Sequence, residues 1–418
     1  MNRTRFIDRI RTNSLNPRKN LMNDLLQQLM IKATELTRNG QLQEATQAIQ
    51  RALRGGASEV FGVSDPATPP PAARASMPSG EALVLDGLTR VIDPPPEIVE
   101  QTQPDSQSGG VVEEKVDPHS VEVDSPHEER WIDGSFTHQG RTLAYKLYLP
   151  PGATGTVAPR PMVLMLHGCT QGAADFAAGT QMNALARDLG VVVLYPEQTQ
   201  HANAQKCWNW FKPQHQQRGR GEPAVLAALA QSITAEHHVD AARVFVAGLS
   251  AGGAMADIVG RCYPDVFAAV GVHSGLPSGS ATDVMTALSA MRSGGASTPT
   301  GVASSAVPPT IVFHGDADAT VHVSNGAAII ESARLTTGQA TGRMPSARTA
   351  EGHSGKGQRY TRTVYADEAG RSTAEYWQLH NAGHAWSGGS SRGSYTNPAG
   401  ADASAEMLRF FLAHPLRA

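Results

Sequence analysis

The chain reads Arg-Val-Phe-Val-Ala-Gly-Leu-Ser-Ala-Gly-Gly-Ala at residues 243–254, where an apolar strand runs into a serine between glycines and then into small residues. A strand, a sharp turn and a helix in this order lift the Ser250 hydroxyl above the end of a sheet. Gly248 and Gly252 leave room for the tight turn. The backbone N–H of Ala251 stays free to stabilise a negatively charged oxygen. These features predict that Ser250 is a nucleophile.

A second stretch, Gly-Ser-Ser-Arg-Gly at residues 389–393, matches the same Gly-x-Ser-x-Gly pattern. Small and polar residues surround it, and no apolar strand comes directly before it, which is typical of a loop. Because 41 of the 418 residues are glycine, the pattern alone has little specificity. The preceding strand therefore distinguishes Ser250 from Ser391.

A serine nucleophile needs a base that takes its proton and an acid that orients the base. In α/β-hydrolases the acid follows the serine along the chain, and the histidine follows the acid. The apolar residues 310–313 lead into two carboxylates, Asp316 and Asp318. We predict that Asp318, four residues after His314, is the acid. We expect Asp316 to hold the turn through its own backbone hydrogen bonds.

The base is expected in the loop after the last strand of the sheet. Residues 373–379 are rich in β-branched and aromatic side chains and are predicted to form that strand. His384 follows among small residues that allow the loop to reach the serine, so we predict that it is the base. His380 lies nearer to the strand, and we expect it to be structural.

A second apolar run, at residues 161–166, ends in His167 and Gly168. A backbone N–H just beyond such a strand can point at the same reacting oxygen as the N–H of Ala251. We therefore predict that Cys169 supplies the second half of an oxyanion hole. The alternative is a plain turn between a strand and a loop.

Five stretches occur together in one order along the chain. They are Leu-His-Gly-Cys-Thr-Gln (166–171), Cys-Trp-Asn-Trp-Phe (207–211), Arg-Gly-Arg-Gly-Glu-Pro (218–223), Gly-Leu-Ser-Ala-Gly-Gly-Ala-Met (248–255) and Gly-His-Ala-Trp-Ser-Gly-Gly (383–389). With them the chain resembles the poly(3-hydroxybutyrate) depolymerase family of esterases over residues 131–415. The resemblance implies a serine esterase of α/β-hydrolase fold that needs no cofactor, with Ser250, Asp318 and His384 as its triad. The family also contains proteins similar to feruloyl and acetylxylan esterases, so the acid and the alcohol of the substrate stay open.

The rest of the chain predicts three regions. Residues 1–54 contain leucine-rich helical patterns interrupted at Asn39-Gly40, which indicates an N-terminal helical extension that either docks on the body or binds a partner or surface. Residues 55–128 are rich in proline and are expected to form a disordered or polyproline-like linker. Residues 129–418 alternate strands with helices, which predicts a catalytic domain with a mostly parallel sheet covered by helices on both faces.

Composition excludes several kinds of partner. The net charge of −3 predicts no strong field for nucleic acid, and no run of apolar residues is long enough for a transmembrane helix. The spacing of histidines and cysteines does not indicate a metal site. The basic N-terminus lacks the apolar core of a signal peptide, which predicts a cytoplasmic location, with secretion as the alternative. The oligomeric state is left open.

Cysteines and tryptophans lie near the predicted site. Cys169 and Cys207 would form a disulfide in an exported protein and stay thiols in a reducing cytosol. Three tryptophans lie near the predicted catalytic residues in the sequence: Trp208, Trp210 and Trp386. They are either core residues or the walls of an apolar groove. We predict that at least one of them contacts the substrate.

Two classes of function follow from the sequence. The first is a serine carboxylic ester hydrolase acting on poly- or oligo-(3-hydroxyalkanoate) esters, with a feruloyl or acetylxylan ester as the alternative substrate. The second is a non-catalytic protein that associates with a polymer or granule surface through the helices of residues 1–54.

Overall fold

The computed structural model describes residues 128–152, 158–295 and 307–416. These residues belong to the second of two compact units in the chain, Val112–Ala418. The helical extension predicted at 1–54 and nearly all of the linker predicted at 55–128 lie outside the described residues.

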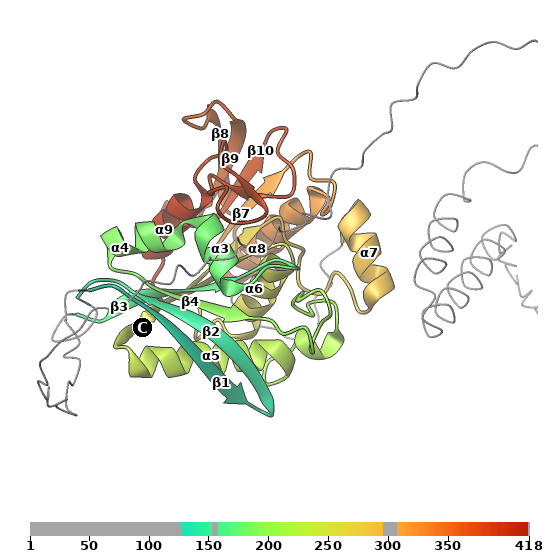
Figure 1. The fold of residues 1–418 in the computed structure, drawn as a ribbon. Helices are drawn as coiled ribbons and strands as arrows, with labels where there is room; N and C mark the ends of the chain where they lie inside the picture. Colours follow the sequence, from blue (N-terminus) through green and yellow to red (C-terminus); the bar gives the residue numbers. More distant parts are fainter. Residues whose placement is uncertain (1–127, 153–157, 296–306, 417–418) are drawn as a thin grey trace, which may run out of the picture. The chain divides into compact units, whose positions relative to one another are not determined.

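The described residues form a ten-stranded sheet, with strand order β1-β2-β4-β3-β5-β6-β7-β10-β9-β8 (Figure 1). The middle strands, from β4 to β10, run parallel, and the antiparallel pairs lie at the two ends of the sheet. The predicted mostly parallel sheet is therefore confirmed. The strands are β1 (Arg130–His138), β2 (Arg141–Leu149), β3 (Arg160–Leu166), β4 (Val192–Glu197), β5 (Val239–Leu249), β6 (Ala269–His273), β7 (Thr310–Gly315), β8 (Ser346–His353), β9 (Arg359–Ala366) and β10 (Ser372–Leu379).

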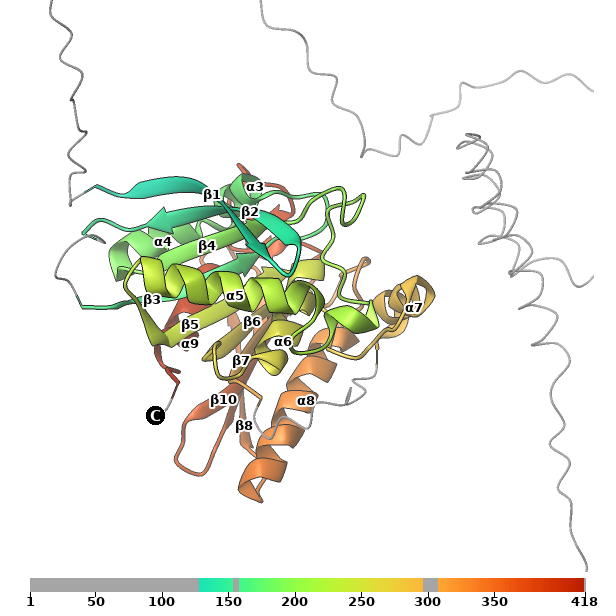
Figure 2. The ribbon, with the colours of Figure 1, turned by 90° about the horizontal axis from the view of Figure 1, so that it is seen from below.

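Helices cover both faces of the sheet, as predicted. One face carries α5, α6, α7 and α8, and the other carries α3, α4 and α9 (Figures 1 and 2). Strand β3 shows why both faces need cover: Leu164 and Leu166 pack into one hydrophobic core, and Val163 and Met165 pack into the other. The helices are α3 (Ala173–Thr180), α4 (Met182–Leu189), α5 (Gly221–Glu236), α6 (Ala251–Cys262), α7 (Val284–Ser293), α8 (Ser324–Thr341) and α9 (Ala403–Leu412).

Three smaller elements complete the fold. The 3₁₀ helix η1 (Pro213–His215) precedes α5, and the short strands β11 (Trp386–Ser387) and β12 (Thr396–Asn397) pair in the loop region after β10. Strands β8 and β9 were not predicted from the sequence, because β8 is exposed on both faces and lacks the alternation of apolar and polar residues that marks a half-buried strand. Within the described ranges, no helix is both long and apolar enough to cross a membrane.

Candidate active site

Ser250 lies at the turn between β5 and α6 with φ 58° and ψ −120°. Such a left-handed conformation is strained for a residue with a side chain and persists only where the surroundings hold it. The Ser250 N–H donates to the His273 carbonyl at 2.9 Å, and the Ser250 carbonyl accepts from the Ala254 N–H at 2.9 Å. A Cβ atom on Gly252 would lie 2.0 Å from the Leu166 carbonyl oxygen, which explains why a glycine is required there.

Asp318 and His384 meet beyond the ends of β7 and β10. His384 Nδ1 donates to Asp318 Oδ2 at 2.7 Å. The other carboxylate oxygen accepts the backbone N–H groups of Thr320 at 2.9 Å and Val321 at 2.8 Å. Burial raises the pKa of Asp318, but the hydrogen bonds from His384 and Val321 outweigh burial and hold that pKa below its usual value. The carboxylate therefore stays ionised, and the Nε2 atom of His384 is the one left to take a proton.

The other two candidates, Asp316 and His380, form a separate pair. His380 Nδ1 lies 2.9 Å from Asp316 Oδ2, and the Asn381 N–H donates to Asp316 Oδ1 at 2.6 Å. His380 Nε2 lies 2.8 Å from Thr361 Oγ1, so both ring nitrogens have partners. The structure therefore gives each aspartate its own histidine, and in this conformation the His380 ring has no free nitrogen for a reacting serine.

These side chains gather at one edge of the sheet. Ser250 follows β5, Asp318 follows β7 and His384 follows β10, and β5, β6, β7 and β10 are consecutive neighbours in the sheet. The carboxyl ends of parallel strands meet at the same edge, where α/β folds place their sites. The positions of these residues support the predicted triad.

His273, the last residue of β6, is a site residue that the sequence did not reveal. Its carbonyl holds the Ser250 N–H, and its Nε2 accepts the N–H of Ser387, three residues after His384, at 3.0 Å. Burial lowers its pKa to about 3, so the ring is neutral. His273 thus connects the turn that contains Ser250 to the loop that contains His384.

His167 holds the peptide that precedes the predicted oxyanion donor. The Gln198 N–H donates to His167 Nε2 at 3.0 Å, so the ring proton is on Nδ1, which donates to the Gly168 carbonyl at 2.7 Å. Burial lowers the pKa of His167 and keeps the ring neutral. The carbonyl and N–H of a trans peptide point in opposite directions, so fixing the Gly168 carbonyl also fixes the direction of the Cys169 N–H.

The loop that contains Cys169 passes close to Ser250. A Cβ atom on Gly168 would lie 3.6 Å from the Cβ atom of Ser250. The Gly168 N–H donates to Gln171 Oε1 at 2.9 Å, which closes the loop on itself. The loop that contains Cys169 therefore lies close to Ser250, and Ala251 is the first residue of α6, directly after Ser250.

Cys169 and Cys207 form a disulfide, and Cys262 is a buried free thiol. Of the two states left open by the sequence, the structure has the bonded one. The disulfide joins the loop of the predicted oxyanion donor to the loop that carries Trp208 and Trp210.

Removing this disulfide is expected to lower the free energy of unfolding by about 2–4 kcal/mol, because the bond closes a long loop in the unfolded chain. The loop spans 38 residues. Urea unfolding of the oxidised protein, the reduced protein and the Cys169→Ala/Cys207→Ala variant measures the loss. The reductant should leave the double variant unchanged. Equal midpoints for the oxidised protein and the double variant would contradict the prediction.

The structure places the three tryptophans in the core. Trp208 is 0%, Trp386 1% and Trp210 5% exposed. Trp208 packs near His167 and Trp386 stacks on His273, with ring centroids 5.6 Å and 5.2 Å apart. A substrate contact by Trp208 or Trp386 would need these rings to become exposed, and in this conformation they pack in the core beside His167 and His273.

Tyr395 is an exposed aromatic residue beside the site that the sequence did not reveal. Its side chain is 47% exposed, and its hydroxyl lies 3.3 Å from Thr170 Oγ1 on the oxyanion loop. Its carbonyl accepts the Trp386 N–H at 2.7 Å, which ties it to the loop after His384. Hydrophobicity patterns do not distinguish Tyr395 from other loop residues.

The second Gly-x-Ser-x-Gly stretch is a loop between β11 and β12, as expected. The N–H of Ser390 donates to the Gly179 carbonyl at 2.8 Å, and Ser391 is exposed. The two-residue strand β11 ends four residues before Ser391, and in this described stretch β12 follows the loop where a helix would follow a nucleophile turn.

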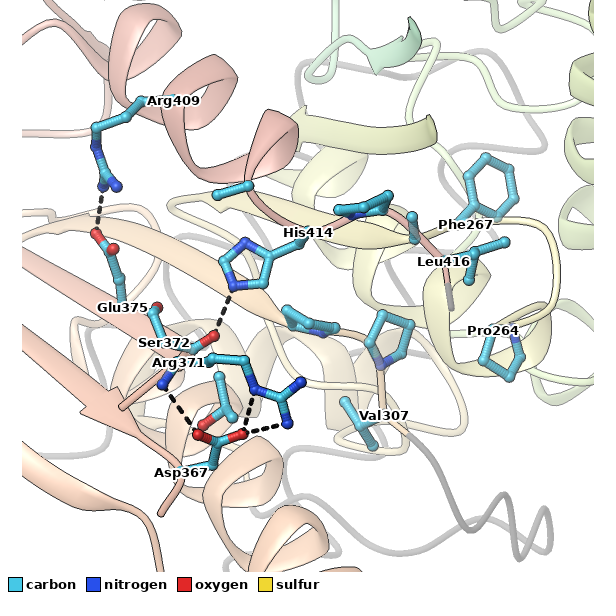
Figure 3. Close-up of a pocket in the computed structure, with 16 residues that line it drawn as sticks. Pro264, Phe267, Val307, Asp367, Arg371, Ser372, Glu375, Arg409, His414 and Leu416 are labelled. Atoms are coloured by element: carbon cyan, nitrogen blue, oxygen red, sulfur yellow. Dashed lines mark hydrogen bonds and ion pairs between the residues drawn. The ribbon is translucent and has the colours of Figure 1, made fainter. Parts of the chain in front are cut away.

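A cavity of about 640 Å³ lies at the opposite edge of the sheet, where β10 begins at Ser372. Its charged groups pair with one another: Arg371 with Asp367 at 2.7 Å, and Arg409 with Glu375 at 2.6 Å (Figure 3). Because the cavity lies at the opposite edge of the sheet, it is separate from the edge that carries Asp318 and His384. No cluster of three or more metal-ligating side chains occurs among the described residues.

Comparison with known proteins decides the family. The family model described as Esterase PHB depolymerase matches residues 143–352, half of the chain. The chain belongs to this family. The matched range contains the predicted oxyanion loop, Ser250 and Asp318, and it ends before His384.

The curated proteins that the chain is similar to have three kinds of name. The chain is 36% identical over 182 residues to poly(3-hydroxyalkanoate) depolymerase C of Paucimonas lemoignei, and this match covers 41% of this chain and 44% of the relative. It is 33% identical over 122 residues to feruloyl esterase B of Thermothelomyces thermophilus, which covers 29% of this chain and 41% of the relative. It is 30% identical over 140 residues to a probable acetylxylan esterase A of Aspergillus fumigatus, and this match covers 33% of this chain and 36% of the relative. The match spans less than half the length of each of these relatives.

A solved structure supports the fold of this family member. The acetyl xylan esterase of Aspergillus awamori superposes with a TM-score of 0.53 at 17% identity, covering 68% of this chain and 99% of that chain. At this identity the likeness concerns the fold alone, and it agrees with the predicted α/β-hydrolase fold.

Proposed function

We propose that this protein is a serine carboxylic ester hydrolase that uses Ser250, His384 and Asp318. The observation that carries the proposal is the partly buried hydrogen bond between His384 and the buried Asp318 carboxylate, at the same edge of the sheet as a serine held in a strained turn. Family membership supports ester hydrolysis as the reaction class.

The reaction proceeds in two halves. His384 Nε2 takes the hydroxyl proton as Ser250 Oγ attacks the ester carbonyl, and Asp318 stabilises the imidazolium that forms. The N–H groups of Cys169 and Ala251 stabilise the oxyanion. The alcohol leaves with the proton from His384. Water, activated by the same histidine, then releases the acid from the acyl-enzyme.

The substrate class that we propose is a poly- or oligo-(3-hydroxyalkanoate) ester. The support is the relative named poly(3-hydroxyalkanoate) depolymerase C, which is 36% identical to this chain in the matched region, a higher identity than that of feruloyl esterase B at 33% or acetylxylan esterase A at 30%. Those two relatives make a phenolic or acetyl ester of plant cell walls the second candidate.

A substrate panel tests this choice. It compares kcat/KM on 3-hydroxybutyrate oligomers, polymer film, methyl ferulate and acetylated xylan, with Ser250→Ala as the blank. The highest value is expected on the hydroxybutyrate oligomers. A higher value on methyl ferulate or acetylated xylan would replace the substrate class and keep the reaction. No Ser250-dependent hydrolysis of any ester, including p-nitrophenyl butyrate, would favour the non-catalytic alternative.

The Cys169–Cys207 disulfide supports the secreted alternative over a cytoplasmic location, because disulfides persist in oxidising compartments. Mass analysis of the native protein for free thiols tests this. One free thiol, that of Cys262, is expected in the secreted case, and three free thiols would support the cytoplasmic prediction.

Deleting residues 1–128 is expected to leave a folded esterase that is active on small esters. The cut precedes Glu129, whose carboxylate accepts hydrogen bonds from Tyr148 at 2.7 Å and Arg187 at 2.8 Å, and β1 begins at Arg130. Activity on p-nitrophenyl butyrate and sedimentation with polymer particles are measured for the full and truncated chains.

If the predicted N-terminal helices bind a polymer surface, the truncated chain keeps its activity and loses adsorption. Equal adsorption of both chains would remove the surface-binding role from residues 1–128. An insoluble truncated chain would show that these residues belong to the catalytic domain.

A further inference from the structure

Glu222 is a buried carboxylate outside the proposed triad. It lies in the first turn of α5 and is 2% exposed. Its Oε1 accepts Gln198 Nε2 at 2.7 Å and Asn209 Nδ2 at 2.6 Å, and its Oε2 accepts the Asn209 backbone N–H at 2.7 Å. All three donors lie on residues 198–209, the segment that follows β4.

Only an ionised carboxylate suits this set of donors. A carboxylate offers acceptors alone, and a buried one is costly unless hydrogen bonds satisfy it. Burial raises the pKa of Glu222, and the contacts with His215 and Asn209 lower it by more, so the group stays charged. Any shift of residues 198–209 away from Glu222 would remove all three of these hydrogen bonds from a buried charge, so the carboxylate fixes the position of the segment.

The first connection from Glu222 to the oxyanion hole runs through Gln198. The side chain of Gln198 donates to Glu222, and its backbone N–H donates to His167 Nε2 at 3.0 Å. His167 in turn donates to the Gly168 carbonyl at 2.7 Å, which sets the direction of the Cys169 N–H.

The second connection runs through Asn209. Asn209 makes two hydrogen bonds to Glu222 and lies two residues after Cys207, which is bonded to Cys169. The side chain of Asn203 adds a contact within the segment, with Nδ2 at 3.3 Å from Asn209 Oδ1. Both connections start at one carboxylate and end at Cys169.

We propose that Glu222 is a positioning residue for the oxyanion hole, acting through Gln198 and Asn209 on the peptide that presents the Cys169 N–H. This inference rests on the proposed function, because it needs Cys169 to be an oxyanion donor. Glu222 itself does not touch the substrate.

The test replaces Glu222 with glutamine. The amide keeps the shape of the side chain but places an NH₂ group against one of the N–H donors, so residues 198–209 must shift. Because loss of one oxyanion donor lowers kcat by about 10²–10³-fold, a displaced donor is expected to lower it by about 10–100-fold, with little change in KM. Glu236→Gln, on the exposed face of the same helix, is the matched control and should retain full activity.

A second readout separates positioning from stability. A trifluoromethyl ketone forms an oxyanion in the hole when the serine adds to it, so its affinity should fall by the same factor as kcat/KM. The Gln198→Met variant cuts the first connection and leaves the Asn209 bonds to Glu222 in place. It is expected to show the same parallel loss with a smaller shift in the urea midpoint.

Three outcomes decide the matter. Parallel losses of kcat/KM and ketone affinity in Glu222→Gln and Gln198→Met support the proposal. A lower urea midpoint with unchanged kcat and ketone affinity in the soluble variants would overturn it; if Glu222→Gln is insoluble, Gln198→Met alone decides. A wild-type protein without Ser250-dependent hydrolysis would instead overturn the proposed function, which keeps the two failures apart.

Discussion

Replacing Ser250 with alanine is expected to lower kcat on p-nitrophenyl butyrate by roughly 10³-fold or more, with the fold intact. The change removes the attacking oxygen and leaves the His384–Asp318 pair and both oxyanion N–H groups in place. Ser250 makes its structural hydrogen bonds through the backbone, so alanine retains them. Steady-state kinetics and circular dichroism measure the two effects.

The control for this variant is Ser391→Ala. Ser391 has the same Gly-x-Ser-x-Gly pattern around it and lies in an exposed loop. Its replacement should leave kcat nearly unchanged. An inactive Ser391→Ala variant together with an active Ser250→Ala variant would reverse the assignment of the nucleophile.

Replacing Asp318 with asparagine is expected to lower kcat by about 10³–10⁴-fold. An asparagine at this position can donate its N–H to His384 Nδ1, which moves the ring proton to Nε2. The base would then be protonated on the nitrogen that must accept the serine proton. The kcat of the variant, measured at the pH of maximal wild-type activity, tests this.

Asp316→Asn is the matched comparison. Asp316 pairs with His380, and the two side chains are 29% and 25% exposed, so the pair contributes about 1 kcal/mol or less to stability. The variant is expected to keep most of its activity and to melt slightly earlier. An inactive Asp316→Asn together with an active Asp318→Asn would exchange the roles of the two aspartates.

Much of the fold and of the candidate site could be predicted because the evidence for it is local. Apolar strands such as 162–166 and 244–247 are recognisable from a few consecutive residues, and glycines next to Ser250 mark its turn. Asp318 and His384 each follow such a strand. Because the carboxyl ends of parallel strands meet at one edge of the sheet, residues that directly follow such strands are expected to lie together there.

Features that depend on contacts distant in sequence could not be predicted. His273 has a polar side chain that does not mark it as part of an apolar strand, yet it is the last residue of β6 and is fully buried. Its role arises from the Ser387 N–H, 114 residues away. Glu222 likewise reads as an ordinary helix-start carboxylate until Asn209 and Gln198 are seen around it.

The tryptophans show the limit of composition as evidence. Large aromatic residues close to catalytic loops in sequence suit both a groove wall and a core, and only burial distinguishes the two roles. Trp208 and Trp386 have their rings in the core, whereas Tyr395, which carries no distinctive pattern, has its ring at the surface beside the oxyanion loop.

The covalent adduct formed with a fluorophosphonate tests the central claim most directly. A phosphonate reacts with a serine only where a base activates the hydroxyl. After incubation, digestion and peptide mass analysis, the account predicts one adduct, on Ser250, and its absence from the Asp318→Asn variant over the same time. An adduct on Ser391, or an unlabelled Ser250 in the wild-type protein, would contradict it.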